Sequence, residues 1–168
     1  MVQIHFGTFL LNTRQVFFES SLTYGIVNLK PIVPGHVLMI SKRVVPRLAD
    51  LNSDEVIDLF SSIHKITPIL EKHYGATALN IAVQDGKHAG QSVPHIHVHI
   101  LPRAKGDFKR NDDVYTELEN QQLDKEYTKL TVDPDEARRP RTVEEMAKEA
   151  LELRTLFPDN APNFDEET

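Results

Sequence analysis

The chain has no cysteine among its 168 residues, which excludes disulfide bonds and thiolate-bound metals. It has no apolar run near the roughly 18 residues of a membrane-spanning helix, and its start lacks the charged and then apolar pattern of a signal peptide. We therefore expect a cytoplasmic or nuclear protein without a membrane partner. With 19 Lys and Arg against 25 Asp and Glu, the net charge is −6. A broad nucleic-acid-binding face is therefore not expected.

The composition is that of one soluble globular domain, since 40% of the residues are hydrophobic and 26% are charged. We place this single domain at residues 1–157. Within it, residues 105–141 are charged and weakly periodic, and we expect a mobile loop excursion there, with a short helix near residues 113–123. Residues 158–168 follow a proline and end in DEET, which predicts a disordered acidic tail.

The order of the predicted elements indicates an α+β fold. Short β-prone runs separated by turn residues fill residues 2–41, and two more follow at 77–84 and 95–103. Between these groups, residues 52–75 carry apolar side chains at spacings of three and four, which predicts one long central helix. A C-terminal helix is predicted over residues 142–157. Strands joined by such short turns favour a mostly antiparallel sheet.

Three of the eight histidines alternate with apolar residues in the run QSVPHIHVHILPR, residues 91–103. In a strand, the side-chain period of two sends His95, His97 and His99 to one face and the intervening apolar residues to the other. The preceding loop, DGKHAGQSVP, contains two glycines, and its backbone amides are expected to be open to a ligand. One face therefore belongs to the core, and the other is a candidate for chemistry.

Three interpretations of this row are open from the residues alone. Two of the histidines could share a zinc ion, although no nearby cluster of Asp, Glu or Cys offers further ligands. The row could also be the ordinary polar face of a strand. The third interpretation, which we favour, is phosphate chemistry, because a neutral imidazole is a nucleophile toward phosphorus and its neighbours can donate to phosphoryl oxygens.

The motif PHIHVHILPR resembles that of the histidine-triad superfamily, and other segments are similar to its fragile-histidine-triad (Fhit) branch, the diadenosine polyphosphate hydrolases. These segments are VNLKPIVPGHVLMISKR, LNSDEVIDLF, AVQDGKHAGQSV, KGDFKRNDDVYTEL and, in the last helix, TVEEMAKEALELR. The resemblance implies a five-stranded sheet and hydrolysis of diadenosine triphosphate to AMP and ADP. It also implies a nucleotidyl-histidine intermediate.

The resemblance assigns roles to individual residues. His97 matches the nucleophile, and His99 matches the neighbour that contacts the phosphate and the leaving oxygen. His95 and the distant His36 match the histidines that brace and orient the row. The remaining matches concern substrate binding: Asn28 for the ribose, Gln84 beside the scissile phosphate, Gly90, Gln91 and Ser92 in a loop that donates to phosphate oxygens, and Phe6, Leu11 and Leu38 in the adenine pocket.

The resemblance also implies a homodimer and a magnesium or manganese ion that arrives with the substrate phosphates, without a tightly bound protein metal. Tyr115 matches a tyrosine that is phosphorylated in some members, and it could equally be an ordinary loop residue. Two other functions remain open. One is the phosphoramidase activity of the same superfamily, and the other is a nucleotide-sensing binding protein whose signal is the substrate complex.

Overall fold

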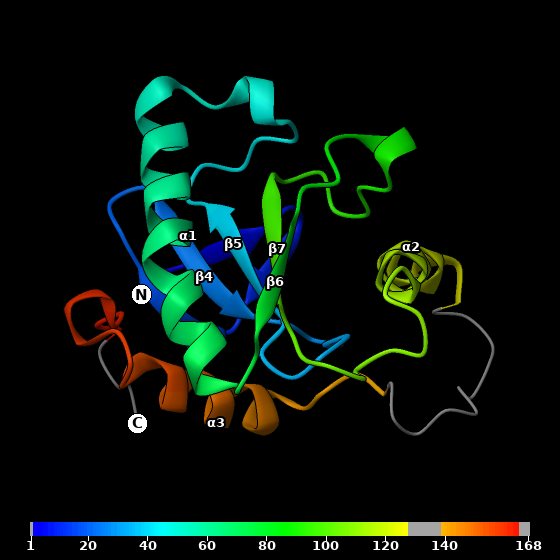
Figure 1. The fold of residues 1–168 in the computed structure, drawn as a ribbon. Helices are drawn as coiled ribbons and strands as arrows, with labels where there is room; N and C mark the ends of the chain where they lie inside the picture. Colours follow the sequence, from blue (N-terminus) through cyan, green and yellow to red (C-terminus); the bar gives the residue numbers. More distant parts are fainter. Residues whose placement is uncertain (1, 128–138, 165–168) are drawn as a thin grey trace.

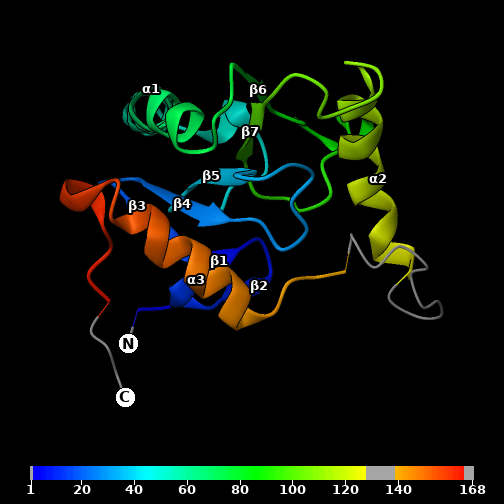
Figure 2. The same cartoon turned by 60° about the horizontal axis from the view of Figure 1, so that its bottom comes forward.

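The protein is described here by a computed structural model that covers residues 2–127 and 139–164. In this part of the chain, five strands form one antiparallel sheet in the order β3-β4-β5-β7-β6 (Figures 1 and 2). Their bounds are Val16–Glu19 for β3, Thr23–Val27 for β4, Val37–Ser41 for β5, His97–Arg103 for β7 and Ala78–Ala82 for β6. The predictions of an α+β fold and of a five-stranded antiparallel sheet are confirmed.

The two predicted helices are present, and each begins with a reciprocal capping box. In α1, Ser53–His73, the cap is Asn52, and in α3, Val143–Arg154, it is Thr142; in both, a glutamate three residues later bonds back to the cap. None of the described helices has the length and apolar composition that crossing a membrane requires.

One face of the sheet is covered by α1 and α3 and holds the main hydrophobic core (Figures 1 and 2). Leu59, Ile63 and Ile66 of α1 pack there against the apolar residues that alternate with the histidines. The alternation therefore places those residues in the core, as predicted. Phe60 is 40% exposed because it lies at the edge of the apolar stripe of α1.

The opposite face carries a second hydrophobic cluster and the short hairpin of β1, Ile4–Phe6, and β2, Phe9–Leu11. Ile4 is buried there among residues of β3, β4 and β5. The register pairs His97 with Ile40 and His99 with Leu38, and directly paired residues point to the same side of a sheet. The two histidines therefore lie on the hairpin side, away from α1.

Part of the excursion at residues 105–141 is ordered structure. The helix α2, Asp113–Tyr127, contains the short helix that was expected near residues 113–123. Its Val114 and Leu118 are buried in a third cluster at the far end of β7. Because these contacts hold α2 to the sheet, the prediction of a mobile excursion is wrong for this helix, and residues 128–138 lie outside the described part of the chain.

The prediction of a disordered tail over residues 158–168 is wrong for its first part. Residues Pro158–Asn160 form a turn of 3-10 helix, and the Asn160 side chain donates to the carbonyl oxygen of Glu19 at 2.9 Å. Phe164 packs against the second hydrophobic cluster. This buried contact and hydrogen bond hold residues 158–164 on the domain, and residues 165–168 lie outside the described residues.

Candidate active site

The position of His97 fixes which of its ring nitrogens carries the proton. Its Nδ1 lies 2.6 Å from the carbonyl oxygen of His95. A carbonyl oxygen only accepts hydrogen bonds, so Nδ1 must be the protonated nitrogen of the neutral ring. No hydrogen bond from the described residues reaches Nε2 of His97. The ring therefore presents an unshared electron pair at Nε2.

A chain of hydrogen bonds settles the tautomer of His99 in the same way. The backbone N–H of Ile32 donates to Nδ1 of His36 at 3.1 Å, which places the His36 proton on Nε2. That Nε2–H faces Nδ1 of His99 at 3.0 Å, so His99 accepts there and is protonated at its own Nε2. This Nε2–H of His99 is buried and has no hydrogen-bond partner among the described residues.

Nε2 of His97, which can accept or attack, and Nε2–H of His99, which can donate, lie on neighbouring rings. The ring centroids of His97 and His99 are 5.1 Å apart. One ring offers an electron pair and the next offers an N–H donor. A buried donor without a partner is costly in a folded protein, and a bound oxygen acceptor would remove that cost. A phosphoryl group placed here would meet a nucleophile at phosphorus and a donor at an oxygen.

His95 is held by groups distant in the sequence. The backbone N–H of Gly7 donates to its Nδ1 at 3.1 Å, and its Nε2 donates to the carbonyl oxygen of Ser41 at 2.8 Å. Gly7 has a φ of +60° at the hairpin turn, and a Cβ there would lie 2.6 Å from Cγ1 of Val93. Glycine is therefore needed for this approach. The bracing role that the sequence assigns to His95 fits these contacts.

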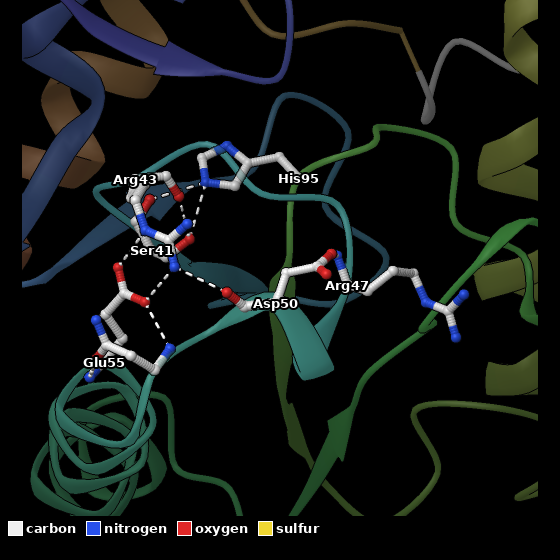
Figure 3. Close-up of polar contacts among 7 residues, drawn as sticks. Ser41, Arg43, Arg47, Asp50, Glu55 and His95 are labelled. Atoms are coloured by element: carbon white, nitrogen blue, oxygen red, sulfur yellow. Dashed lines mark hydrogen bonds and ion pairs between the residues drawn. The ribbon is translucent and has the colours of Figure 1, made fainter.

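The support of His95 continues to the beginning of α1 (Figure 3). The Ser41 hydroxyl donates to the carbonyl oxygen of Arg43 at 2.7 Å, and the Arg43 guanidinium donates to both carboxylate oxygens of Glu55 at 2.8 and 2.7 Å. The hydrogen bond from Arg43, with one from Asn52, lowers the pKa of Glu55 to about 2. Glu55 stays charged and ties the strand end to the helix.

The pKa values of the four clustered histidines are all lowered, chiefly by burial. The pKa of His36 falls to about 3, and nearby Arg141 and His97 contribute to that shift. The pKa of His95 falls to about 4 through burial, against the raising effect of its bond to Ser41. The pKa values of His97 and His99 are also lowered by burial. All four rings are neutral at pH 7, as a nucleophilic imidazole requires.

We expect acid to destabilise the fold in a defined pH window. Histidines of the unfolded chain take up protons below about pH 6.5, while His95 stays neutral to about pH 4 and His36 to about pH 3. Between these limits the unfolded state binds more protons. The free energy of unfolding should therefore fall by about 1.4 kcal/mol per pH unit for each such histidine. Urea unfolding at a series of pH values measures this slope.

The matched variants for this measurement are His95→Asn and, as a control on an exposed loop residue, His88→Gln. His95→Asn should flatten the slope between pH 6.5 and 4, and the control should leave it unchanged. If the free energy of unfolding changed equally with pH in the wild type and in His95→Asn, burial would not lower the pKa of His95 as stated.

Asn28 is brought to the histidines, as predicted. It is buried, its Oδ1 accepts the backbone N–H of Lys30 at 3.0 Å, and its Nδ2 lies 3.2 Å from Nε2 of His36. Both of these nitrogens carry hydrogens in the tautomer given above, so the Asn28 amide keeps donor capacity for another acceptor. A ribose hydroxyl would satisfy it, and the ribose contact stays a prediction.

The residues predicted for the adenine pocket gather beside His97. The Phe6 ring centroid lies 5.0 Å from that of His97, in an edge-to-face arrangement. Leu38 is buried in the second hydrophobic cluster, and Leu11 packs against it. These three residues come from β1, β2 and β5 and belong to one apolar cluster, of which Phe6 lies against His97. Adenine binding there is a prediction that no contact yet tests.

The loop before the histidine run differs from the prediction of open backbone amides. The N–H groups of Gly90 and Gln91 donate to the carbonyl oxygens of Lys87 and Gly86, both at 3.1 Å, because glycines with positive φ turn the loop back on itself. The Gln91 side chain donates to the carbonyl oxygen of Pro46 at 2.5 Å. The backbone amides of Gly90 and Gln91 are thus already bonded within the loop, and the substrate-binding roles that the resemblance implies for these two residues stay predictions.

The substrate-binding roles expected for Ser92 and Gln84 stay predictions. Ser92 makes no hydrogen bond within the described residues, so its hydroxyl is available to donate to a phosphate. Gln84 follows β6, whose Ala82 is paired with His99. Continuing that register by two residues places Gln84 opposite His97.

Gly7, Ser41 and Arg141 support the site, and none was predicted from the sequence. Arg141 donates through Nε to the carbonyl oxygen of Asn28 at 3.0 Å. A glycine in a hairpin turn was the single local signal for Gly7. Ser41 meets Nε2 of His95 through its backbone carbonyl oxygen at 2.8 Å and its hydroxyl at 3.1 Å, 54 residues away in the chain, and Arg141 is 113 residues from Asn28. Nothing in the described residues groups three His, Asp or Glu side chains to hold a metal ion.

Comparison with known proteins gives consistent matches along most of the chain. Residues 11–106 match the family model of the HIT domain. The chain is 42% identical to the bis(5'-adenosyl)-triphosphatase of Dictyostelium discoideum, over 95% of this chain and 97% of that protein. It is 45% identical to the asymmetrical bis(5'-nucleosyl)-tetraphosphatase of Schizosaccharomyces pombe, over 94% and 96%. The structure of the Plasmodium falciparum diadenosine triphosphate hydrolase superposes with a TM-score of 0.72 at 27% identity, covering 94% of this chain and 85% of that one.

Proposed function

The chain belongs to the HIT domain family, and from this membership and the site geometry we propose that it hydrolyses dinucleoside polyphosphates, cleaving diadenosine triphosphate to AMP and ADP. One observation carries the mechanism. Nε2 of His97 has a free electron pair beside the unpartnered Nε2–H of His99. The relatives named for such hydrolysis match nearly the full length of the chain, which supports the substrate class.

In the proposed first step, Nε2 of His97 attacks the α-phosphorus. A nitrogen–phosphorus bond forms, the bond from phosphorus to the bridging oxygen breaks, and ADP leaves with the electron pair. The carbonyl oxygen of His95, 2.6 Å from Nδ1, stabilises the positive charge that develops on the ring. In the second step, water attacks the same phosphorus: an oxygen–phosphorus bond forms and water gives up a proton to the solvent. The nitrogen–phosphorus bond breaks, its electron pair returns to Nε2, and AMP leaves with His97 neutral again.

His99 assists both steps through its Nε2–H, which donates to a phosphoryl or leaving oxygen. His36 keeps that proton in place, because its own Nε2–H occupies Nδ1 of His99 at 3.0 Å. Such preorganised donors act most strongly where water is excluded. Both rings are buried, so the donor is oriented before the substrate arrives.

We also propose that magnesium or manganese enters with the polyphosphate. The four histidines are neutral at pH 7, because burial lowers their pKa values, so they do not balance the negative charge of the substrate. A divalent cation coordinated by phosphate oxygens would do so. Its ligands would be substrate oxygens and water.

The proposed function is tested by comparing turnover of three substrates by the purified protein: diadenosine triphosphate, diadenosine tetraphosphate and an AMP-lysine phosphoramidate. We expect the largest kcat/KM for the triphosphate. Faster cleavage of the phosphoramidate would favour the phosphoramidase alternative. Tight binding without turnover of any of the three would favour a nucleotide-sensing protein.

We propose further that two copies of the chain pair through β6. This strand is an edge of the sheet, and its Ile81 is 50% exposed. The opposite edge strand, β3, is covered by α3. An open edge with an exposed apolar residue favours pairing with another strand, and a symmetric dimer would use the same edge twice.

The dimer prediction is tested by measuring the molar mass of the protein by light scattering as it elutes from a size-exclusion column. The wild type should have twice the chain mass of 19.1 kDa, and Ile81→Lys should shift it toward the single-chain mass. Ile57 of α1 is 64% exposed and gives a matched control, because Ile57→Lys makes the same change at an exposed isoleucine outside β6. A wild-type protein that remains a single chain at high concentration would contradict the proposal.

A further inference from the structure

The loop between β4 and β5, residues 28–36 and named here the Asn28–His36 loop, sets the proton position on His99. Within the loop, the backbone N–H of His36 donates to the carbonyl oxygen of Val33 at 3.1 Å. Two further bonds reach side chains, from Lys30 N–H to Oδ1 of Asn28 and, the second, from Ile32 N–H to Nδ1 of His36. The second of these bonds determines that His36 donates to His99. A small movement of this loop would therefore change the donor that the site offers to a phosphoryl oxygen.

Two side chains from outside the sheet hold the beginning of this loop: Gln121 of α2 donates to the carbonyl oxygen of Lys30 at 2.7 Å, and Arg141 makes the other bonds. Arg141 donates from its backbone N–H to the carbonyl oxygen of Leu29 at 3.0 Å. Its guanidinium donates through Nε at 3.0 Å, and also through Nη2, to the carbonyl oxygen of Asn28. Arg141 directly precedes α3, so the C-terminal helix reaches the loop through this side chain.

The end of the loop is held by Tyr74, which follows α1. A Cβ placed on Gly35 would lie 2.4 Å from Cδ2 of Tyr74, so the ring lies directly against the backbone of the residue before His36. The Tyr74 hydroxyl donates to Oε1 of Glu149 at 2.9 Å. The other oxygen of the same carboxylate, Oε2, accepts from Nη1 of Arg141 at 2.6 Å.

One carboxylate on α3 thus joins the two groups that hold the two ends of the loop. The side chains of Arg141 and Glu149 are only 19% and 18% exposed, so their ion pair is better shielded from water than a surface pair. We propose that Arg141, Glu149 and Tyr74 form a clamp that positions the Asn28–His36 loop and, through it, the Nε2–H of His99. The three are positioning residues, because no atom of theirs need touch the substrate.

The clamp explains why a helix at the end of the chain matters to chemistry at β7. Arg141 fixes two successive carbonyl groups of the loop, and Tyr74 prevents the glycine before His36 from moving outward. With the clamp intact, His36 has one position from which it can donate to His99. Without it, the loop has freedom to place either nitrogen of His36 toward His99, and the tautomer of His99 is no longer fixed.

The test uses Arg141→Met, which keeps an unbranched apolar stem and removes the guanidinium. We expect kcat for diadenosine triphosphate to fall about tenfold, with KM changed by no more than about threefold, since the lost orientation matters mainly in the transition state. Nitrogen-15 NMR of the free protein should show His99 protonated at Nε2 in the wild type and mixed between its two tautomers in the variant.

Arg154 provides a matched control at the other end of α3. It also donates to backbone carbonyls, those of Val16 at 2.8 Å and Thr13 at 3.1 Å, away from the Asn28–His36 loop. Arg154→Met should lower the melting temperature by an amount similar to Arg141→Met while leaving kcat within about twofold of the wild type. The clamp proposal is overturned by an equal loss of kcat in both variants, or by an Arg141→Met protein with wild-type kcat and tautomer.

Tyr74→Phe decides the question if Arg141→Met does not fold. The ring still packs on Gly35, and only the bond that joins Tyr74 to Glu149 is lost. We expect kcat to fall about threefold with a detectable second tautomer of His99, and an unchanged kcat and spectrum would overturn the proposal. The kinetic readout rests on the proposed function, whereas the NMR readout does not. A wild-type protein without hydrolase activity would defeat that function and still leave the clamp testable.

Discussion

Replacing His97 by asparagine is expected to lower kcat for diadenosine triphosphate by about four orders of magnitude. The variant loses the nitrogen that bonds to phosphorus. Its side-chain amide can still donate to the carbonyl oxygen of His95, which in the wild type lies 2.6 Å from Nδ1 of His97. The fold and the substrate affinity should therefore be retained. Single-turnover kinetics with calorimetric binding of the substrate separates the two effects.

The control for this variant is His64→Asn, which changes an exposed histidine of α1 by the same substitution. It should have wild-type turnover and affinity. A His97→Asn protein that binds the dinucleotide and turns it over at a rate near that of the wild type would show that another group attacks phosphorus.

Replacing His99 by leucine is expected to lower kcat by about 100- to 1000-fold, the usual loss for one preorganised donor to a transition-state oxygen. Leucine fills much of the buried volume of the ring and removes the unpartnered Nε2–H. It also leaves Nε2–H of His36 without its acceptor. Some loss of stability is therefore expected beside the loss of turnover, and a thermal melt on the same sample measures it.

The relative order of the variants gives a further check on the roles. His36→Leu removes the group that orients His99 and leaves the Nε2–H of His99 in the site, so its loss of kcat should be smaller than that of His99→Leu. The expected order of turnover is His36→Leu, then His99→Leu, then His97→Asn, from fastest to slowest. A His99→Leu protein faster than His36→Leu would contradict the assignment of His99 as the donor.

The sequence predicted the features that depend on local pattern. The period of two placed His97 and His99 on one face of β7 and the intervening apolar residues in the core. The residue types before each helix predicted where α1 and α3 begin, because capping bonds span only three residues. The family resemblance predicted that His36 lies at the same site as His99, although the two are 63 residues apart in the chain.

The features that the sequence did not predict depend on contacts between distant segments. The bonds of His95 to Gly7 and Ser41 span 88 and 54 residues, so no local pattern in the sequence indicates them, although the Ser41 hydroxyl takes part beside the backbone atoms. The backbone amides of the loop at residues 86–91 were expected to be open. Those of Ala89, Gly90 and Gln91 donate within the loop instead, because the positive φ angles of Gly86 and Gly90 fold it back on itself. The acidic composition of residues 158–168 likewise favoured a prediction of disorder, although Phe164 packs against the second hydrophobic cluster.

The central claim is that the neutral imidazole of His97 forms a transient covalent bond to the α-phosphorus of the substrate. Rapid quenching of the reaction at neutral or basic pH, followed by peptide mass spectrometry, tests it most directly, because a phosphorus–nitrogen bond is lost in acid. We predict that the trapped protein carries one nucleotidyl group, located on His97, which disappears as AMP forms. Steady production of AMP and ADP with no nucleotidyl group on His97, or with that group on another residue, would contradict the mechanism.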